Sequence, residues 1–306
     1  MEEGLTRRSP LGYISRRLQR VFVPWLTWFS LIFALTLTVG IVQGRLGIHA
    51  SQSSARLVGH TLYSCLFYSA YWFVPNLLIA LGVLLACRRF LFDIRLGCLL
   101  LAPSLFYGLN IHAHWIPIEN HTEALFGFIF YLWLGAWTAR NFTSVQAWIE
   151  RTSMMWLLTL AALTGLAALE ESFLLDAANA PLPLNVLRIS NQAYSVAFVL
   201  VLFKLRRPIW PRAMNVRATM FGIYLTHPFT MWVLISIIRR KILNEIAGLT
   251  GIAHTATVLF FLLGYFAATY GCSLALTQWL LKDKFLRWTV GDFTSVRPTQ
   301  GEGEPS

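Results

Sequence analysis

The sequence predicts an all-α polytopic membrane protein with about eight transmembrane helices. Of its 306 residues, 56% are hydrophobic and only 13% are charged, and the mean hydropathy is +0.57. Soluble domains average about 25% charged residues, so this composition favours a bundle of membrane helices. The net charge of +11 does not indicate nucleic-acid binding, because the basic residues cluster at the ends of apolar segments. We therefore expect the lipid bilayer, and no nucleic acid, as a partner.

Eight apolar segments have the length and composition expected of spanning helices. They run over residues 21–42, 67–86, 96–110, 124–139, 154–169, 186–205, 218–238 and 256–281. No soluble domain fits between them, so residues 1–287 are assigned to one membrane domain and residues 288–306 to a disordered cytoplasmic tail. The four cysteines are scattered without paired spacing and are expected to be reduced packing residues.

Lysine and arginine residues fall mainly on one side of the predicted bundle. Nineteen lie in the termini and in alternate loops, five lie in the remaining loops, and Arg188 lies at the start of a helix. Cytoplasmic loops carry the excess of basic residues in membrane proteins. Both termini are therefore predicted to be cytoplasmic, which agrees with an even number of crossings.

A histidine lies deep in the seventh predicted helix. His227 comes roughly 15 Å after Arg217, near the middle of a hydrocarbon layer about 30 Å thick. Pro228 follows it and has no N–H for the carbonyl of Tyr224, so the helix is expected to bend. Tyr224 and His227 share a helix face. The pattern predicts a phenol and an imidazole directed at other protein groups, either for chemistry or for packing between helices.

Two further predicted helices carry polar or aromatic groups at membrane depth. These are Arg188, Asn191, Gln192 and Ser195 in residues 186–205, and Tyr71, Trp72, Pro75 and Asn76 in residues 67–86. The first four follow helical spacing, so we expect that stripe to face the bundle or a wet cavity. Polar groups also join membrane helices, but three helices with inward polar faces favour a lined cavity.

The loop at residues 110–123 contains no lysine or arginine. It holds His112, His114 and His121, two carboxylates and a tryptophan. The spacing matches no tight metal-ligand motif and Pro117 interrupts it, so we predict no metal site. The alternatives are an ordinary polar loop and a rim that contacts a polar substrate.

Four segments share a pattern with one family of membrane enzymes. Residues 14–25 contain Arg17-x-x-Arg20 before a proline and aromatics, residues 71–78 contain Trp-Phe-x-x-x-Leu, residues 128–135 are Phe-rich and end in Leu-Gly, and residues 222–228 contain Tyr-Leu-x-His. In their order and spacing, these segments resemble the integral-membrane acyltransferases known as acyltransferase family three, which acylate sugars and polysaccharides at the membrane.

The resemblance implies a membrane O-acyltransferase in the bacterial inner (plasma) membrane. Such an enzyme would move an acyl group, with acetyl the expected case, from a cytoplasmic donor to a sugar hydroxyl of a cell-envelope glycan or glycolipid. Acyl-CoA is the implied co-substrate, and no bound cofactor is expected. Transporters or flippases of a polar lipid or sugar remain an alternative class, although no paired helix breaks in two similar halves are visible.

Acyl transfer needs a base, groups that stabilise the oxyanion and a docking site for the donor. His227 would serve as base or orienting partner, and Tyr224 would donate to the acyl carbonyl or support the site. Arg17 and Arg20 would bind the donor phosphates, with positive-inside anchoring as the alternative. The acceptor would meet Trp72, Asn76, Arg188 and Asn191.

The chain also departs from the family pattern. The family typically has ten helices with a proposed catalytic histidine in the first, whereas the first predicted helix here resembles the family's third. We therefore expect no counterpart of the two N-terminal helices in residues 1–306. A late start codon, a truncated gene and a variant that works without that histidine all remain open. A catalytically incomplete remnant is accordingly a further alternative.

Overall fold

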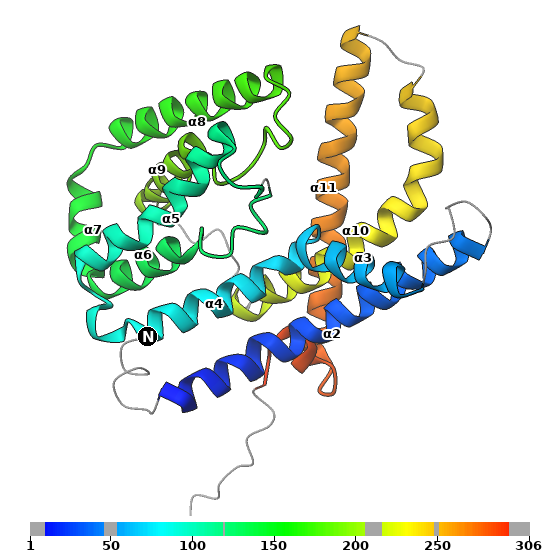
Figure 1. The fold of residues 1–306 in the computed structure, drawn as a ribbon, viewed down its shortest axis with the longest axis horizontal. Coiled ribbons are helices and arrows are strands. Elements are labelled where there is room, and N and C mark those ends of the chain that lie inside the picture. Colours follow the sequence, from blue (N-terminus) through cyan, green and yellow to red (C-terminus); the bar gives the residue numbers. More distant parts are fainter. Residues whose placement is uncertain (1–9, 46–53, 119, 206–215, 248–250, 294–306) are drawn as a thin grey trace, which may run out of the picture. The chain divides into compact units, whose positions relative to one another are not determined.

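A computed structural model describes residues 10–45, 54–118, 120–205, 216–247 and 251–293. The described residues form helices joined by turns and loops, with no strand among them, so the predicted all-α membrane architecture is confirmed (Figure 1). The chain divides into two compact units. Unit 1 comprises Met1–Tyr13 and Trp72–Ile209, and unit 2 comprises Ile14–Tyr71 and Trp210–Ser306.

Unit 2 contains two long helices from the C-terminal third of the chain and most of the first helix. Its elements are α2 (Pro10–Arg45), α3 (Ser54–Phe67), η1 (Ala70–Trp72, whose last residue begins unit 1), α10 (Val216–Ala247), α11 (Gly251–Lys282) and η3 (Arg287–Val290). Helix α10 packs against α11, and η3 contacts both. The indole Nε1 of Trp28 in α2 donates to the carbonyl of Thr289 in η3 at 3.0 Å. This hydrogen bond links α2 to η3.

Small and hydroxylic residues bring α10 and α11 close together. A Cβ atom added at Gly222 would lie 2.3 Å from Cγ2 of Thr277, so only a glycine permits this approach. About two turns further along α10, the hydroxyls of Thr230 and Ser273 form a hydrogen bond of 2.7 Å. Small residues and hydroxyl bonds are the usual means by which membrane helices associate.

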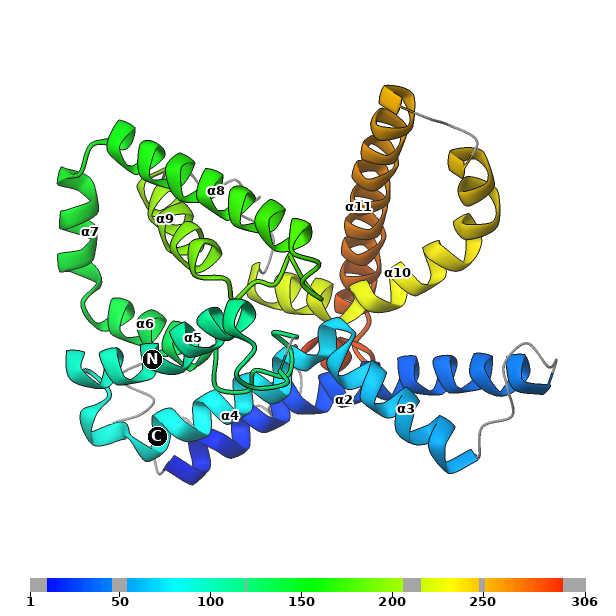
Figure 2. The same cartoon turned by 45° about the horizontal axis from the view of Figure 1, so that its top comes forward.

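Unit 1 contains the middle of the chain. Its elements are α4 (Phe73–Ala86), η2 (Arg88–Phe90), α5 (Ile94–Ala113), α6 (Ile129–Arg140), α7 (Phe142–Arg151), α8 (Met154–Ala177) and α9 (Ile189–Leu205). Helices α8 and α9 lie side by side, as Figures 1 and 2 show. Trp133 of α6 is 2% exposed and lies against Gly97 of α5, while its Nε1 donates to the carbonyl of Leu91 at 2.7 Å.

The predicted count of eight spanning helices is too high for the described residues. Five helices are long and apolar enough to cross a membrane, or six if the bent pair Ala55–Phe67 and Ala70–Ala86 counts as one span. The predicted segment at 124–139 yields only the 12-residue α6, about 18 Å long, because residues 124–128 form turns outside any helix. Helix α9 has 17 residues and is also classed as a shorter apolar helix.

Two helices were not predicted. Helix α3 precedes the second predicted segment, and the amphipathic α7 has a buried Ile149 with an exposed Phe142 and Trp148. The predicted tail at 288–306 is partly described. Its residues up to 293 belong to unit 2, where Val290 is fully buried, and residues 294–306 lie outside the described part of the chain.

Candidate functional site

His227 is a half-buried residue of α10, within the candidate membrane span Ala218–Ile237. Its Nδ1 lies 2.7 Å from the carbonyl oxygen of Tyr224 and 3.3 Å from that of Ile223. Carbonyl oxygens only accept hydrogen bonds, so Nδ1 carries the proton. In the neutral ring, Nε2 then holds the lone pair, and no hydrogen-bond partner for Nε2 lies among the described residues. The imidazole is therefore held in the tautomer that can accept a proton at Nε2.

Pro228 is the reason that the Tyr224 carbonyl is open to the imidazole. In an α-helix the carbonyl of residue 224 accepts the N–H of residue 228. Pro228 lies inside α10 and has no N–H, so this carbonyl lacks its helical donor. The ribbon of α10 also changes direction along its length, as Figure 2 shows. His227 Nδ1 replaces the missing backbone donor.

Two tyrosine hydroxyls form hydrogen bonds between α10 and η1. The hydroxyl of Tyr224 donates to the carbonyl of Ala70 at 2.6 Å, and the hydroxyl of Tyr71 donates to the carbonyl of Leu225 at 3.0 Å. Tyr71 is fully buried, and its own carbonyl accepts from the indole of Trp25 at 2.9 Å. A phenol has one proton to donate, and Ala70 accepts that of Tyr224. The geometry thus gives Tyr224 a positioning role next to His227, with 5.9 Å between the two ring centroids.

The start of α4 forms a second polar cluster, in unit 1. The ring of Trp72 lies 5.0 Å from that of Phe128 and meets the ring of His121 edge to face at 5.3 Å. Asn76 is 3% exposed, and its Nδ2 lies 3.4 Å from the carbonyl of Thr122. Among the described residues, neither Asn76 Oδ1 nor Thr122 Oγ1 has a hydrogen-bond partner, although both atoms are buried. Such orphaned oxygens are uncommon and cost about 1–3 kcal/mol each.

His121 in this cluster is desolvated. Burial lowers its pKa from the ordinary value, because the charged imidazolium loses water contacts. The ring is therefore neutral around pH 7 and lies nearly perpendicular to the ring of Trp72. The sequence predicted the loop that contains His121 as an ordinary polar loop or as a substrate rim near Trp72 and Asn76, but it did not predict the ring contact between His121 and Trp72.

The predicted stripe at the start of the sixth segment has mainly internal partners. Arg188 is 5% exposed, and its guanidinium donates to the carbonyl of Ala168 at 2.6 Å and to that of Asn185 at 3.0 Å. Asn191 donates to the carbonyl of Val186 at 2.9 Å. Arg188 therefore joins α8 to the start of α9.

The stripe also does not face inward along its whole length. Gln192 is buried and accepts from the hydroxyl of Tyr131 at 2.8 Å, but Ser195 is exposed. Helix α9 begins at Ile189, and the carbonyl of Arg188 accepts the N–H of Gln192 at 2.9 Å, so Arg188 is the residue immediately before the helix.

The arginines proposed for the donor lie in α2. Arg20 is exposed, and the side chain of Arg17 lies outside the described residues. The structure brings His227, Tyr224 and Tyr71 together in unit 2. In unit 1 it groups Trp72 and Asn76.

Among the described residues, no group of three or more His, Cys, Asp or Glu side chains is arranged to hold a metal ion.

The fold and these polar clusters define a class of protein: a polytopic α-helical membrane protein with an ionisable group held inside a membrane span. The sequence profile of an acyltransferase domain matches residues 3–277. The chain therefore belongs to acyltransferase family 3, as the four motifs predicted. No curated protein and no solved structure matches the chain.

Proposed function

We propose that this protein is a membrane O-acyltransferase that moves an acyl group, with acetyl the expected case, from cytoplasmic acyl-CoA to a sugar hydroxyl of a cell-envelope glycan or glycolipid. Membership of a membrane acyltransferase family supports acyl transfer in general. The observation that most supports a catalytic centre in this chain is the fixed tautomer of His227, whose Nδ1–H is held by the Tyr224 carbonyl.

His227 acts as the general base in this proposal. Its Nε2 takes the proton of the acceptor hydroxyl while the hydroxyl oxygen attacks the acyl carbonyl carbon. The new C–O ester bond forms, the thioester C–S bond breaks, and the proton passes to the departing thiolate. Tyr224 and Tyr71 position the base by fastening α10 at the turn that carries it.

The two substrates engage different residues. Arg17 and Arg20 bind the phosphates of the donor, since guanidinium groups match phosphate oxygens. The acceptor contacts Trp72 and Asn76. The Asn76 amide donates to the Trp72 carbonyl at 3.3 Å, and its buried Oδ1 has no hydrogen-bond partner among the described residues. Arg188 and Asn191 support the acceptor region by holding the start of α9 in place.

Replacing His227 with alanine tests the base. Full-length protein in proteoliposomes, given labelled acetyl-CoA and a cell-envelope glycan fraction, should lose more than about tenfold of its transfer rate. Its abundance in membranes should remain unchanged. The matched control is His60→Ala, because His60 is an exposed histidine on α3 of the same unit. Equal loss of activity and abundance in the His227 variant would leave that residue with a packing role alone.

Charge reversal tests the donor site. Arg17→Glu and Arg20→Glu should each raise the KM for acyl-CoA by about tenfold or more, because each replaces a phosphate ligand with a repelling carboxylate. Arg56→Glu on α3 is the control, since Arg56 is an exposed arginine that the charge pattern assigns to the opposite side of the membrane. An unchanged KM, in variants of verified topology, would exclude both residues as phosphate ligands.

A transporter of a polar lipid or sugar is the second candidate function. The buried oxygens of Asn76 and Thr122 have no hydrogen-bond partner in the part of the chain that the structure describes, and they also suit the transport of a polar molecule. A transporter would move labelled sugar or lipid across the proteoliposome membrane without consuming acyl-CoA. A catalytically incomplete remnant would show neither transfer nor movement.

A further inference from the structure

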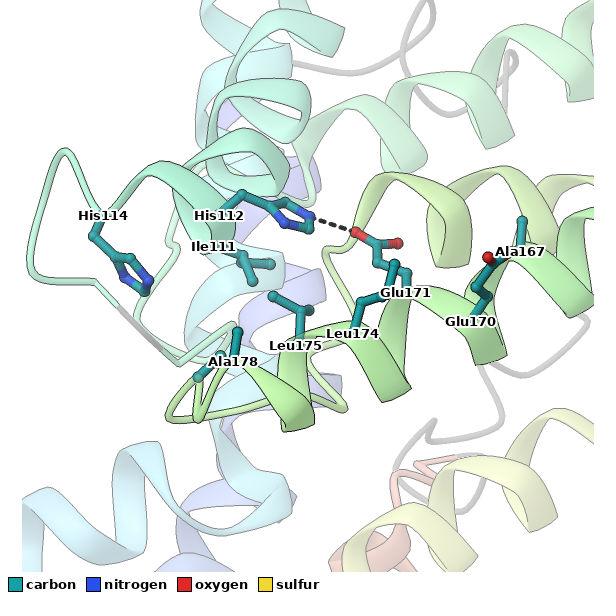
Figure 3. A pocket seen from close by; sticks show the side chains of 10 residues that line it. Ile111, His112, His114, Ala167, Glu170, Glu171, Leu174, Leu175 and Ala178 are labelled. Carbon is teal, nitrogen blue, oxygen red and sulfur yellow. Dashed lines mark hydrogen bonds and ion pairs between the residues drawn. The ribbon is translucent and has the colours of Figure 1, made fainter.

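A pocket of about 340 Å³ lies in unit 1 between the C-terminal ends of α5 and α8 (Figure 3). Its polar lining consists of His112 and His114 from the end of α5, and Glu170 and Glu171 from α8. The remaining lining is aliphatic, with Ile111 and Leu175 among its members. Ligand pockets range from about 300 to 1,000 Å³, so this one suits a single small ligand or one residue of a longer ligand.

A histidine and a carboxylate are paired across the two helices at this pocket. His112 Nε2 lies 2.7 Å from Glu171 Oε1, and Figure 3 shows the imidazole directed at the carboxylate. Ser190 donates its hydroxyl to the other oxygen of Glu171. A carboxylate only accepts, so Nε2 of His112 carries a proton and Nδ1 is the nitrogen left for a ligand. The side chain of Glu171 is 14% exposed and that of His112 is 46% exposed, so both can contact a bound molecule.

The lining groups select for a ligand that donates hydrogen bonds. The two carboxylates accept, and none of the described residues that line the pocket is a lysine or arginine that could attract an anion. A hydroxyl can donate to a carboxylate and can either donate to or accept from an imidazole, whatever its protonation state. The aliphatic part of the lining can cover the C–H face of a sugar ring. We propose that this pocket binds a neutral polyhydroxylated ligand, one sugar ring in size.

The position of the pocket along its helices agrees with this ligand. Glu171 lies about 26 Å along α8 from Met154, at the end away from Arg151. On the predicted topology that end faces the outside of the cell, where envelope glycans are accessible. The pocket then holds one sugar residue of the glycan acceptor, whose reacting residue contacts Trp72 and Asn76. This identification rests on the proposed function, whereas the binding itself does not.

Saturation-transfer NMR on full-length protein in nanodiscs tests the binding, with glucose, mannose and galactose as probes and glucuronate as the charged comparison. We expect signal from at least one neutral hexose and at least about tenfold weaker binding of glucuronate, because the carboxylates repel it. Signal that is equal or stronger for glucuronate would overturn the proposal. The absence of signal from all three hexoses, with the protein shown to be folded, would also overturn it.

Three substitutions locate the binding. Glu171→Gln removes the charged acceptor with almost no change of shape, Glu170→Gln does the same at an exposed position, and Ala167→Phe fills the pocket. The two Gln variants should each weaken hexose binding at least about fivefold, the loss expected for one hydrogen bond of about 1 kcal/mol. Ala167→Phe should weaken it at least as much, because the phenyl ring occupies the space of the ligand. The control Glu150→Gln, on α7, should bind as the wild type does. Unchanged binding in Ala167→Phe and Glu170→Gln would place the ligand elsewhere.

Acyl-transfer kinetics separate this inference from the proposed function. If transfer occurs and the pocket variants leave the KM for the acceptor unchanged, the pocket does not hold the acceptor, while the proposed function stands. If hexoses bind at the pocket but no acyl group is transferred, the proposed function fails and the binding site stands.

Discussion

Replacing Pro228 with alanine is expected to stabilise the protein and, at the same time, to lower its activity. A proline inside a helix costs about 3 kcal/mol relative to alanine, through a lost hydrogen bond and a clash of its ring. Here the Tyr224 carbonyl recovers about 1 kcal/mol by accepting from His227 Nδ1 at 2.7 Å. Alanine should therefore raise the free energy of unfolding by about 2 kcal/mol.

The loss of activity follows from competition for the same carbonyl. In the alanine variant, the new N–H of residue 228 can donate to the Tyr224 carbonyl, which His227 Nδ1 occupies in the wild type. The imidazole then loses about 1 kcal/mol of the interaction that fixes its tautomer and orientation, which corresponds to about fivefold in rate.

The assay combines a melting temperature in detergent with acyl transfer at saturating donor. Pro103→Ala is the matched control, because Pro103 also lies inside a helix, α5, and has no histidine beside it. That variant should gain stability and keep its activity. If Pro228→Ala retains full activity, His227 does not depend on the proline for its orientation. If the variant is less stable as well as less active, the loss of activity reports structural damage instead.

Two further predictions concern packing and pH. Gly97→Ala should destabilise the protein by about 1–3 kcal/mol, because the new Cβ would lie 2.1 Å from Cη2 of Trp133. Gly82→Ala, with nothing within 4 Å, should be neutral or stabilising, and equal melting temperatures for the two variants would refute this reasoning. Burial lowers the pKa of His121, so the unfolded chain binds its proton more readily and stability is lost as the pH falls below about 6.5. Between about pH 7.5 and 5.5 the wild type should lose more stability than His121→Gln, and identical pH profiles would contradict the assignment.

The fold class could be predicted because long apolar segments dominate the sequence. The segments predicted at 154–169, 218–238 and 256–281 correspond to the long helices α8, α10 and α11. The segment at 124–139 was misjudged, since apolar residues in a loop packed against other helices look the same as those in a spanning helix. Ala124 illustrates this: it is 1% exposed and precedes the start of α6 by five residues.

The candidate site was predictable only where its parts are close in sequence. The spacing of Tyr224, His227 and Pro228 indicated a shared face and an open carbonyl, which are local properties of one helix. The partner of Tyr71 is the carbonyl of Leu225, 154 residues away, and no pattern in one sequence predicts that pairing. The pairing of His112 with Glu171, 59 residues apart, was missed for the same reason.

The contact between Gly222 and Thr277 constrains how this family member can vary. A methyl group at position 222 would overlap the side chain of Thr277, so enlargement on α10 requires a smaller residue on α11. Because Gly222 belongs to the same short motif as His227, substitution at position 277 is restricted by a residue about one and a half helical turns from the proposed base. Positions 222 and 277 are therefore expected to covary among homologues, and such covariation would indicate the contact between α10 and α11.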